Sequence, residues 1–192
     1  RKGSNSIKYD NLIEHFGTED LLPLWIADMD FRSSPPILRA IEERAKHGIF
    51  GYSFRDDHSV ELFVDWVKRR YNWDIKPEWT TSSPGVVSAL ALSIRIFSKK
   101  GDKILIQTPV YPPFFSVIES NGREVVTSQL IRKENSYEVD WEDFEEKMAS
   151  GVTMFILCSS HNPVGKLWSK EELKRMGEIA LKHNVLVFSD EI

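Results

Sequence analysis

The stretch VTMFILCSSHNPVGKLWSKEELKRMGEIALKHNVLVFSDEI, residues 152–192, decides the fold class. It begins with VTMFILCSS, whose apolar part is typical of a buried strand. It ends with VLVFSDEI, which has a second apolar part of this kind. Between the two runs, Ser169 and Glu172 have the spacing of a capping box, which marks the N-terminus of a helix. Apolar residues then recur at helical spacing, at Leu173, Met176, Gly177, Ala180 and Leu181. A strand, a helix and a second strand in this order predict two parallel strands joined by a crossover helix.

The same alternation extends toward the N-terminus. Apolar segments at 103–109 and 123–131 predict strands, and helical patterns occupy the neighbouring segments 86–100, 111–122 and 140–150. The apolar strands are continuous rather than alternating, which is typical of strands that are buried on both faces of a parallel sheet. We therefore expect an α/β fold in which a mainly parallel sheet is flanked by helices.

Two further helices are expected before this region. The segment ILRAIEERAKHG (37–48) has apolar residues at helical spacing and ends in glycine. The segment SVELFVDWVKRRYN (59–72) is predicted to bury one face, made of Leu62, Trp66, Val67 and Tyr71. The chain before SSPP (33–36) shows no clear period, so an irregular segment is expected there.

Composition and charge argue against several classes of protein. The 192 residues include 25 lysines and arginines against 29 aspartates and glutamates, a net charge of −4, and no basic stripe indicates a nucleic-acid partner. No apolar run approaches the length that spans a membrane, and the N-terminal residues lack the apolar core of a secretory signal. The single cysteine, Cys158, is expected to be a buried, inert thiol. A cytoplasmic location is therefore predicted.

An acidic residue follows the last apolar strand. Val185 to Phe188 are expected to be buried on both faces of the sheet, and Asp190 comes two residues later. An ionised carboxylate at the end of a buried strand is costly unless a cation or a strong donor meets it. A protonated ring nitrogen would satisfy Asp190, and the carboxylate would in turn keep that nitrogen protonated. Glu191 is expected to turn aside, because neighbouring residues of a strand face opposite ways.

The segment SSPG (82–85) precedes the helix expected at 86–100. Small residues at this place leave backbone N–H groups available at the helix N-terminus, where the helix dipole favours a phosphate group. The alternative is an ordinary N-cap made by Ser82 or Ser83. The glycine spacing matches neither a P-loop nor a dinucleotide-binding fingerprint. Taken alone, the segment favours the simple cap.

Two more residues are expected at the carboxyl ends of strands, where ligands bind in open parallel sheets. Tyr111 lies between Pro109 and Pro112, so its ring could stack on a flat heterocycle or pack over the edge of the sheet. Asn162, in HNPVG, offers an amide at a turn, although Asn-Pro and Gly are common in ordinary turns. Its neighbour His161 has no metal-ligand spacing with the other histidines and is expected at the surface or behind the site.

Together, these four features specify one ligand. It has a phosphate group, a flat aromatic ring, a polar ring substituent near Asn162 and a basic ring nitrogen near Asp190. Pyridoxal 5′-phosphate (PLP) has all four, and its protonated ring withdraws electrons from the α-carbon of an amino acid. The residues therefore predict a PLP site at the carboxyl edge of the sheet, and they predict no metal site.

At these residues the sequence resembles the fold-type I, aspartate-aminotransferase-like PLP enzymes, and the resemblance extends over essentially the whole chain. SSHNPVGKLWSKEEL (159–173) resembles the Asn-Pro-x-Gly segment of that family, and VFSDEI (187–192) resembles the strand that ends in its pyridinium-binding aspartate. LPLWIADMDF (22–31) and GIFGYSF (48–54) together resemble the cystathionine β-lyase-like C–S lyases of the same superfamily.

The resemblance implies roles for residues around the cofactor ring. Tyr111 would stack on the ring, Asn162 would bind its phenolic oxygen and Asp190 would bind its nitrogen. The segment around Ala27 and Asp28 would line the substrate side.

The resemblance also implies how the phosphate group is bound. The backbone N–H groups of Val86 and Val87, after Gly85, would bind it within the subunit. Tyr52 would reach the phosphate group of the neighbouring subunit, so a homodimer is implied.

The resemblance implies a division of the chain into two parts. Residues 1–45 would contribute to the small domain and the substrate side, and residues 46–192 would form the N-terminal part of the large PLP-binding domain, a PLP-dependent transferase-like fold that is incomplete at its C-terminus. Two further strands would lie between a strand near residue 80 and the strand that ends at Asp190. The Schiff-base lysine is expected beyond Ile192, so no catalytic residue is assigned, and Lys166 is expected to face solvent.

The function that the resemblance implies is a PLP-dependent β-elimination. A cystathionine- or cysteine-type amino acid would give pyruvate, ammonia and a thiol. A PLP-dependent aminotransferase is the alternative, because its cofactor site is nearly the same. A third possibility is a non-catalytic PLP-binding regulatory module or an inactive fragment, because the chain lacks the Schiff-base lysine.

Overall fold

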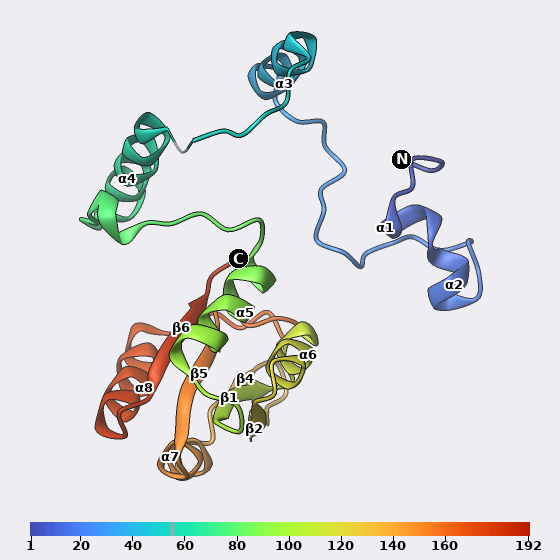
Figure 1. Cartoon of the computed structure of the whole chain (residues 1–192). Coiled ribbons are helices and arrows are strands. Elements are labelled where there is room, and N and C mark those ends of the chain that lie inside the picture. Colours follow the sequence, from blue (N-terminus) through green and yellow to red (C-terminus); the bar gives the residue numbers. More distant parts are fainter. Residues whose placement is uncertain (55) are drawn as a thin grey trace. The chain divides into compact units, whose positions relative to one another are not determined.

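The computed structural model describes residues 1–54 and 56–192. The chain divides into two compact units, Arg1–Ser59 (unit 1) and Val60–Ile192 (unit 2). Figure 1 shows three helices in unit 1 and the sheet with its covering helices in unit 2. The predicted cofactor site, apart from Tyr52, falls entirely within unit 2.

Four parallel strands form the sheet of unit 2. They are β1 (Lys103–Thr108), β2 (Glu124–Gln129), β5 (Val152–Cys158) and β6 (Leu186–Asp190), in the order β2-β1-β5-β6. All three neighbouring pairs are parallel. Each connection between consecutive strands of this sheet contains a helix, as parallel pairing requires. The predicted α/β class with a mainly parallel sheet is confirmed.

Two helices, α5 (Val86–Phe97) and α6 (Pro113–Ser120), cover one face of the sheet. Leu90 and Ile94 of α5 and Phe114 of α6 are almost completely buried there. They share one apolar cluster with alternate residues of the two central strands, which are Ile104, Ile106, Met154, Ile156 and Cys158. Each such side chain contributes roughly 1.5–3 kcal/mol when it is fully buried, so this cluster fixes α5 and α6 on the sheet.

The helices α7 (Trp141–Ala149) and α8 (Lys170–Lys182) cover the opposite face. The intervening residues of the central strands, Leu105, Phe155 and Leu157, point into this second cluster. Because β1 and β5 bury both faces, they are the continuous apolar strands that the sequence predicts. The fold is therefore a sheet between two helical layers.

The helix α8 begins at the predicted capping box. Ser169 Oγ accepts the backbone N–H of Glu172 at 3.1 Å, and Glu172 Oε2 accepts the backbone N–H of Ser169 at 2.8 Å. The predicted inner face of this helix is only partly correct, because Met176, Ile179 and Ala180 are buried whereas Leu173 and Leu181 are exposed.

Strand β6 differs from its prediction. Val185 is buried, but Leu186 and Val187 are 42% and 39% exposed, so the strand is not buried on both faces. The exposure of these residues follows from the position of the strand. Within the described chain, β6 lies at the edge of the sheet and pairs only with β5. A local apolar pattern cannot distinguish an edge strand from a central one.

The segments outside the sheet also depart from prediction in detail. The strand expected near residue 80 is replaced by a 3₁₀ turn, Pro77–Trp79, and a short antiparallel hairpin, β3 (Ile131–Arg132) with β4 (Tyr137–Glu138), was not predicted. Helix α4 (Asp57–Tyr71) is confirmed. Its predicted inner face is wrong except for Val67, since Leu62, Trp66 and Tyr71 are at least half exposed.

Unit 1 contains α1 (Ile7–Asp10), α2 (Leu12–Phe16) and α3 (Pro35–His47). The last is the helix predicted from residue 37, whereas α1 and α2 lie where an irregular segment was expected. Ion pairs tie the end of the LPLWIADMDF segment to the start of the chain. Arg1 pairs with Asp28 and Asp30, and Lys8 Nζ lies 3.2 Å from Asp30 Oδ2.

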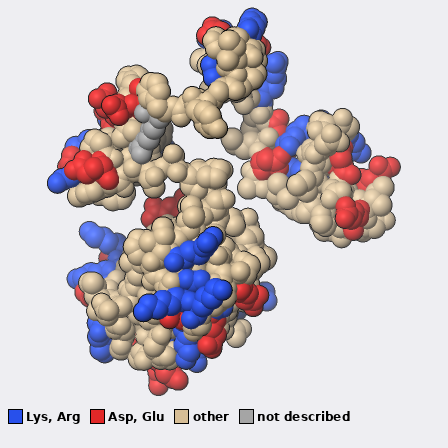
Figure 2. All heavy atoms as spheres, in the orientation of Figure 1, with Lys and Arg blue, Asp and Glu red and all other residues tan. Residues whose placement is uncertain are grey.

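The surface carries charges of both signs. Figure 2 shows lysine and arginine side chains grouped on the visible face of unit 2, with acidic side chains at its margins. In the described chain, no helix combines the length and the apolar character that crossing a membrane requires. Nor do the described histidine, cysteine, aspartate and glutamate side chains gather in threes that could hold a metal ion.

Candidate cofactor-binding site

Asp190 ends β6 and is buried, with 4% of its surface exposed. Its carboxylate accepts the backbone N–H of Ile192 at 3.1 Å, and no lysine or arginine of the described chain forms an ion pair with it. A buried carboxylate with one neutral donor is poorly compensated, so a cation or a strong donor is favoured beside it. Glu191 turns away as predicted, and its Oε1 accepts the hydroxyl of Ser189 at 2.9 Å.

The N-terminus of α5 lies at the same end of the sheet as Asp190. Figure 1 shows the first turn of α5 at the end of the sheet where β6 stops. Phe188 of β6 packs against the same apolar cluster that contains Leu90 of α5. A group bound to Asp190 on this face therefore extends toward the first turn of α5.

No side chain caps α5. Gly85 is the N-cap residue, and Ser83 Oγ donates to the carbonyl oxygen of Gly85 at 3.0 Å instead of accepting a helical N–H. The alternative of a cap by Ser82 or Ser83 is therefore wrong. A Cβ built on Gly85 would meet no atom within 4 Å, so the space above this backbone is open. The first-turn N–H groups, including those of Val86 and Val87, are available to an anion.

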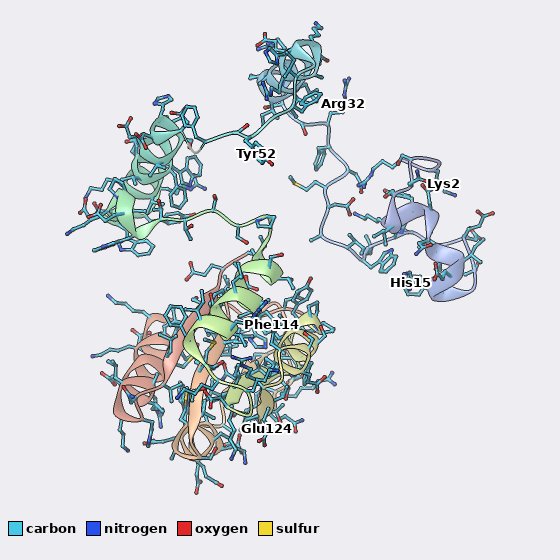
Figure 3. The ribbon with its side chains drawn as sticks, in the orientation of Figure 1. Lys2, His15, Arg32, Tyr52, Phe114 and Glu124 are labelled. Carbon is cyan, nitrogen blue, oxygen red and sulfur yellow. The ribbon has the colours of Figure 1, made fainter. Side chains whose placement is uncertain are left out.

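Tyr111 follows β1 and is partly buried against the α5–α6 cluster. Its ring meets that of Phe114 edge to face, with centroids 5.9 Å apart and planes at 86°. Figure 3 shows Phe114 in the packed interior of unit 2, between the helices and the sheet. The two interpretations of Tyr111 are thus compatible, because the ring packs at the end of the strand and is only partly buried there.

Asn162 is exposed in the loop 159–165, which follows β5. Its backbone N–H donates to Cys158 Sγ at 3.4 Å, and its side-chain amide makes no hydrogen bond to the described chain. The strands β1, β5 and β6 are neighbours, so Tyr111, Asn162 and Asp190 come from three adjacent strand ends. The structure thereby brings them to one edge of the sheet, together with the start of α5.

The remaining sequence-predicted residues lie elsewhere. Tyr52, labelled in Figure 3, belongs to unit 1 and is fully exposed. Asp28 also belongs to unit 1, where Arg1 occupies its carboxylate. The expected Schiff-base lysine is not a residue of this chain, so that expectation stays a prediction.

The structure contradicts one expectation about the 159–165 loop and its flank and decides between the two alternatives of another. Lys166 does not face solvent, because its side chain is 18% exposed and its Nζ lies 2.9 Å from Glu172 Oε1 and 5.0 Å from the centre of the Trp168 ring. His161 is 1% exposed, so of its two expected positions the surface is excluded and the position behind the site remains. The sequence did not reveal the contacts of Lys166 with Glu172 and Trp168, because these side chains meet only when the loop folds back on the start of α8.

The environment of Cys158 agrees with its prediction as a buried, inert thiol. Burial raises the pKa of this thiol, the N–H of Asn162 opposes the shift, and the charge of Asp190 adds to it. A cysteine with a raised pKa is a poor nucleophile at neutral pH. Its sulfur instead serves as an acceptor at the base of the Asn162 loop.

Known proteins match this chain in sequence and in fold. A model of the family described as aminotransferase class I and II matches residues 19–192. The chain belongs to this family. As in other members of the aminotransferase class I and II family, a parallel sheet is flanked by helices, but the chain spans about half the length of the curated relatives it matches.

Three relatives of this family member are informative. The chain is 45% identical to the cystathionine beta-lyase PatB of Bacillus subtilis over 193 residues, which cover 100% of the chain and 50% of that protein. It is 32% identical to cystalysin of Treponema denticola, whose crystal structure contains pyridoxal 5′-phosphate, with a TM-score of 0.92 over 100% of this chain and 50% of that one. It is 34% identical to the PLP-bound C–S lyase of Staphylococcus hominis, with a TM-score of 0.90 over 100% of this chain and 49% of that one.

Proposed function

We propose that the protein to which this chain belongs is a PLP-dependent carbon–sulfur β-lyase that acts on cystathionine- or cysteine-type amino acids. Support comes from the names of its relatives, which include a cystathionine beta-lyase at 45% identity and a PLP-bound C–S lyase at 34% identity. In the reaction, the α-proton is removed and the Cβ–S bond breaks with its electron pair on sulfur. A thiol leaves, and addition of water to the remaining fragment gives pyruvate and ammonia.

The observation that carries the cofactor proposal is the buried carboxylate of Asp190. It has no ion-pair partner in the described chain, and it shares a sheet edge with a helix N-terminus that no side chain caps. These two features fit the ring nitrogen and the phosphate group of one PLP molecule. PLP, when bound, supplies an electron-withdrawing ring that stabilises negative charge at the α-carbon.

Each residue has a defined task in this proposal. Asp190 keeps the ring nitrogen protonated, because a close negative charge raises the pKa of a base. Tyr111 covers one face of the ring, and the exposed amide of Asn162 binds its phenolic oxygen. These contacts orient the ring and exclude water from the face that Tyr111 covers.

The phosphate group is bound by backbone in this proposal. The N–H groups of Val86 and Val87, with the open space above Gly85, form the phosphate seat. Tyr52 would contribute from the partner subunit of a homodimer.

The assignment of larger parts is proposed on the same resemblance. Residues 1–45 would serve the small domain and the substrate side, through Ala27 and Asp28, and residues 46–192 would serve the large domain. A cytoplasmic location is proposed from the single cysteine, Cys158, which is free and suits a reducing compartment.

The test of the cofactor proposal is titration of the full chain with PLP. Saturable binding that changes the PLP absorbance and quenches tryptophan fluorescence is expected. Asp190→Ala should weaken it strongly, because the ring nitrogen would lose its partner. Absence of saturable binding in the unmodified chain would disprove the cofactor site.

An aminotransferase is the second candidate, and the description of the matching family favours it. Incubation of the whole protein with cystathionine separates the two activities. A lyase produces pyruvate without any keto acid in the reaction, whereas an aminotransferase forms no product until a keto-acid acceptor is added. Pyruvate that appears only with the acceptor would overturn the lyase proposal.

A further inference from the structure

Two loops carry the residues proposed to contact the cofactor ring. The loop 109–112 follows β1 and contains Tyr111, and the loop 159–165 follows β5 and contains Asn162. Because β1 and β5 are hydrogen-bonded neighbours, both loops begin at the same edge of the sheet. Neither loop has regular structure of its own, so the spacing between Tyr111 and Asn162 depends on contacts between the loops.

One buried side chain makes such a contact. His161 Nε2 lies 2.9 Å from the carbonyl oxygen of Pro109, and the side chain of His161 is almost completely buried. A carbonyl oxygen can only accept a hydrogen bond, so Nε2 carries a proton and donates it to Pro109. His161 is adjacent to Asn162, and Pro109 lies two residues before Tyr111, so this bond joins the two loops next to the ring-contacting residues.

The orientation of His161 is fixed by further contacts. Its ring meets that of Trp168 edge to face at 5.3 Å, and Trp168 Nε1 donates to the carbonyl oxygen of Cys158 at 2.8 Å. The backbone of His161 bonds to Lys166 and Gly165, at 2.9 and 2.8 Å, which closes the loop around it. The bond to Pro109 and the contact with Trp168 hold the ring itself, and the backbone bonds hold the main chain that carries it, so the donor is preorganised.

We propose that His161 is a positioning residue for the cofactor site: its Nε2–H bond to Pro109 fixes the distance between Tyr111 and Asn162. This role rests on the proposed PLP function of the same site. His161 acts through the two loops and touches neither cofactor nor substrate. Loss of the donor would let the loops move apart and would weaken ring binding, with the sheet and its helices unchanged.

Burial keeps this donor in its neutral form. It lowers the pKa of the imidazole below the ordinary value of 6.5, against the opposing effect of the carbonyl oxygens of Pro109 and Cys158. Neutral His161 therefore keeps one defined donor at physiological pH.

The experiment compares three variants of the full chain. His161→Phe keeps the aromatic contact with Trp168 but lacks the donor, and His161→Gln keeps an amide donor of similar reach. His183→Phe is the matched control, since His183 is partly buried at the end of α8, at the opposite edge of the sheet. The readouts are PLP affinity by titration and amide hydrogen exchange of the two loops.

For His161→Phe, the PLP dissociation constant should rise about tenfold, the equivalent of one hydrogen bond, and exchange should accelerate at 109–112 and 159–165. His161→Gln should restore most of the affinity, and His183→Phe should leave affinity and loop exchange unchanged. Equal affinity and equal loop exchange in His161→Phe and the unmodified chain would overturn the proposal. A loss of affinity shared equally by His183→Phe would also overturn it, because the effect would then be general destabilisation.

Two further results are distinguishable. If the unmodified chain does not bind PLP, the proposed function fails, and the exchange measurement alone then decides whether His161 holds the loops together. If His161→Phe does not fold, His161→Asn replaces it, because the shorter amide cannot reach Pro109 and the same readouts apply.

Discussion

Cys158 and Asp190 are register partners at the carboxyl ends of β5 and β6. The thiol and the carboxylate therefore lie side by side on the face of the sheet that α5 and α6 cover, at the edge where the backbone of α5 begins. The raised pKa of Cys158 reflects burial first and the charge of Asp190 as a further cause. A negative group in these apolar surroundings is costly unless a cation lies beside it, so we expect Asp190 to pair with a cationic ligand.

Asp190→Asn is expected to separate stability from binding. The amide oxygen can still accept the N–H of Ile192, while the buried charge is lost, so the cofactor-free chain should gain about 1 kcal/mol in its free energy of unfolding. PLP affinity should fall at least about tenfold, because a neutral amide cannot stabilise a protonated ring nitrogen as a carboxylate does. Denaturant unfolding and PLP titration measure the two effects.

Asp140→Asn is the control for this variant. Asp140 caps α7 by accepting the N–H of Asp143 at 3.1 Å, and asparagine caps helices about as well as aspartate. Neither stability nor PLP affinity should change. An Asp190→Asn chain that is less stable and still binds PLP normally would contradict the assignment.

Gly85→Ala tests the phosphate seat. The added methyl group would meet no atom of the described chain, so the free energy of unfolding should change by less than about 1 kcal/mol. The methyl group would occupy space that a phosphate group needs close to the backbone, so PLP affinity should fall.

Gly177→Ala is the matched control, because a methyl group there is also unobstructed but lies within α8, far from the site. It should raise stability by roughly 0.5–1 kcal/mol through helix propensity and leave PLP affinity unaltered. Similar PLP affinities for both variants would argue against the seat.

The buried imidazole of His161 should make stability depend on pH. Its pKa in the folded chain is lower than 6.5, so the unfolded chain binds a proton more readily. Stability is therefore retained above about pH 6.5, falls as the pH decreases below that value, and stops falling from this cause once the folded-state pKa is passed. Urea unfolding at a series of pH values measures the fall. His161→Gln should reduce it, and an unaltered pH profile in His161→Gln would show that this histidine is not the group responsible.

Gln107 offers a stability test away from the cofactor. Its side chain is 1% exposed on β1, and neither its amide oxygen nor its amide nitrogen has a hydrogen-bond partner in the described chain. Gln107→Met keeps a similar volume and removes two unsatisfied polar atoms, so the free energy of unfolding should increase by about 1–2 kcal/mol. Gln129→Met, at the exposed end of β2, should change it by less than about 0.5 kcal/mol. A loss of stability in Gln107→Met would mean that the amide is satisfied by solvent inside the protein.

The local sequence pattern predicted most helices and strands of unit 2, but it predicted the burial of their side chains less well. The spacing of Ser169 and Glu172 located the start of α8, because a capping box involves only residues of one turn. The same reasoning placed Leu186 and Val187 in the interior, because burial depends on which strand lies alongside, and that information is not local. Leu181 and Trp66 were wrongly predicted to be buried for the same reason. An apolar stripe predicts which face of a helix could be buried, but it does not show whether another element covers that face.

The candidate site divides in a similar way. Gly85, Tyr111, Asn162 and Asp190 could be singled out because together they fit one ligand and match the motifs of the family that the sequence resembles. The burial of His161 and the ion pair of Lys166 could not, because Pro109 is 52 residues from His161 along the chain and meets it only across two strand ends.

The sequence by itself determined the order of the four sheet strands and of the helices between them, the parallel class of the sheet and the strand ends that carry polar residues, since these follow from periodicity and capping within a few residues. Only the tertiary structure decided that, within the described residues, β6 pairs with β5 alone and no side chain caps α5, and that a buried histidine joins the two ring-contacting loops. The physical reason is that burial and hydrogen-bond pairing belong to groups far apart in the chain, whose meeting is fixed by the packing of the sheet and its two helical layers.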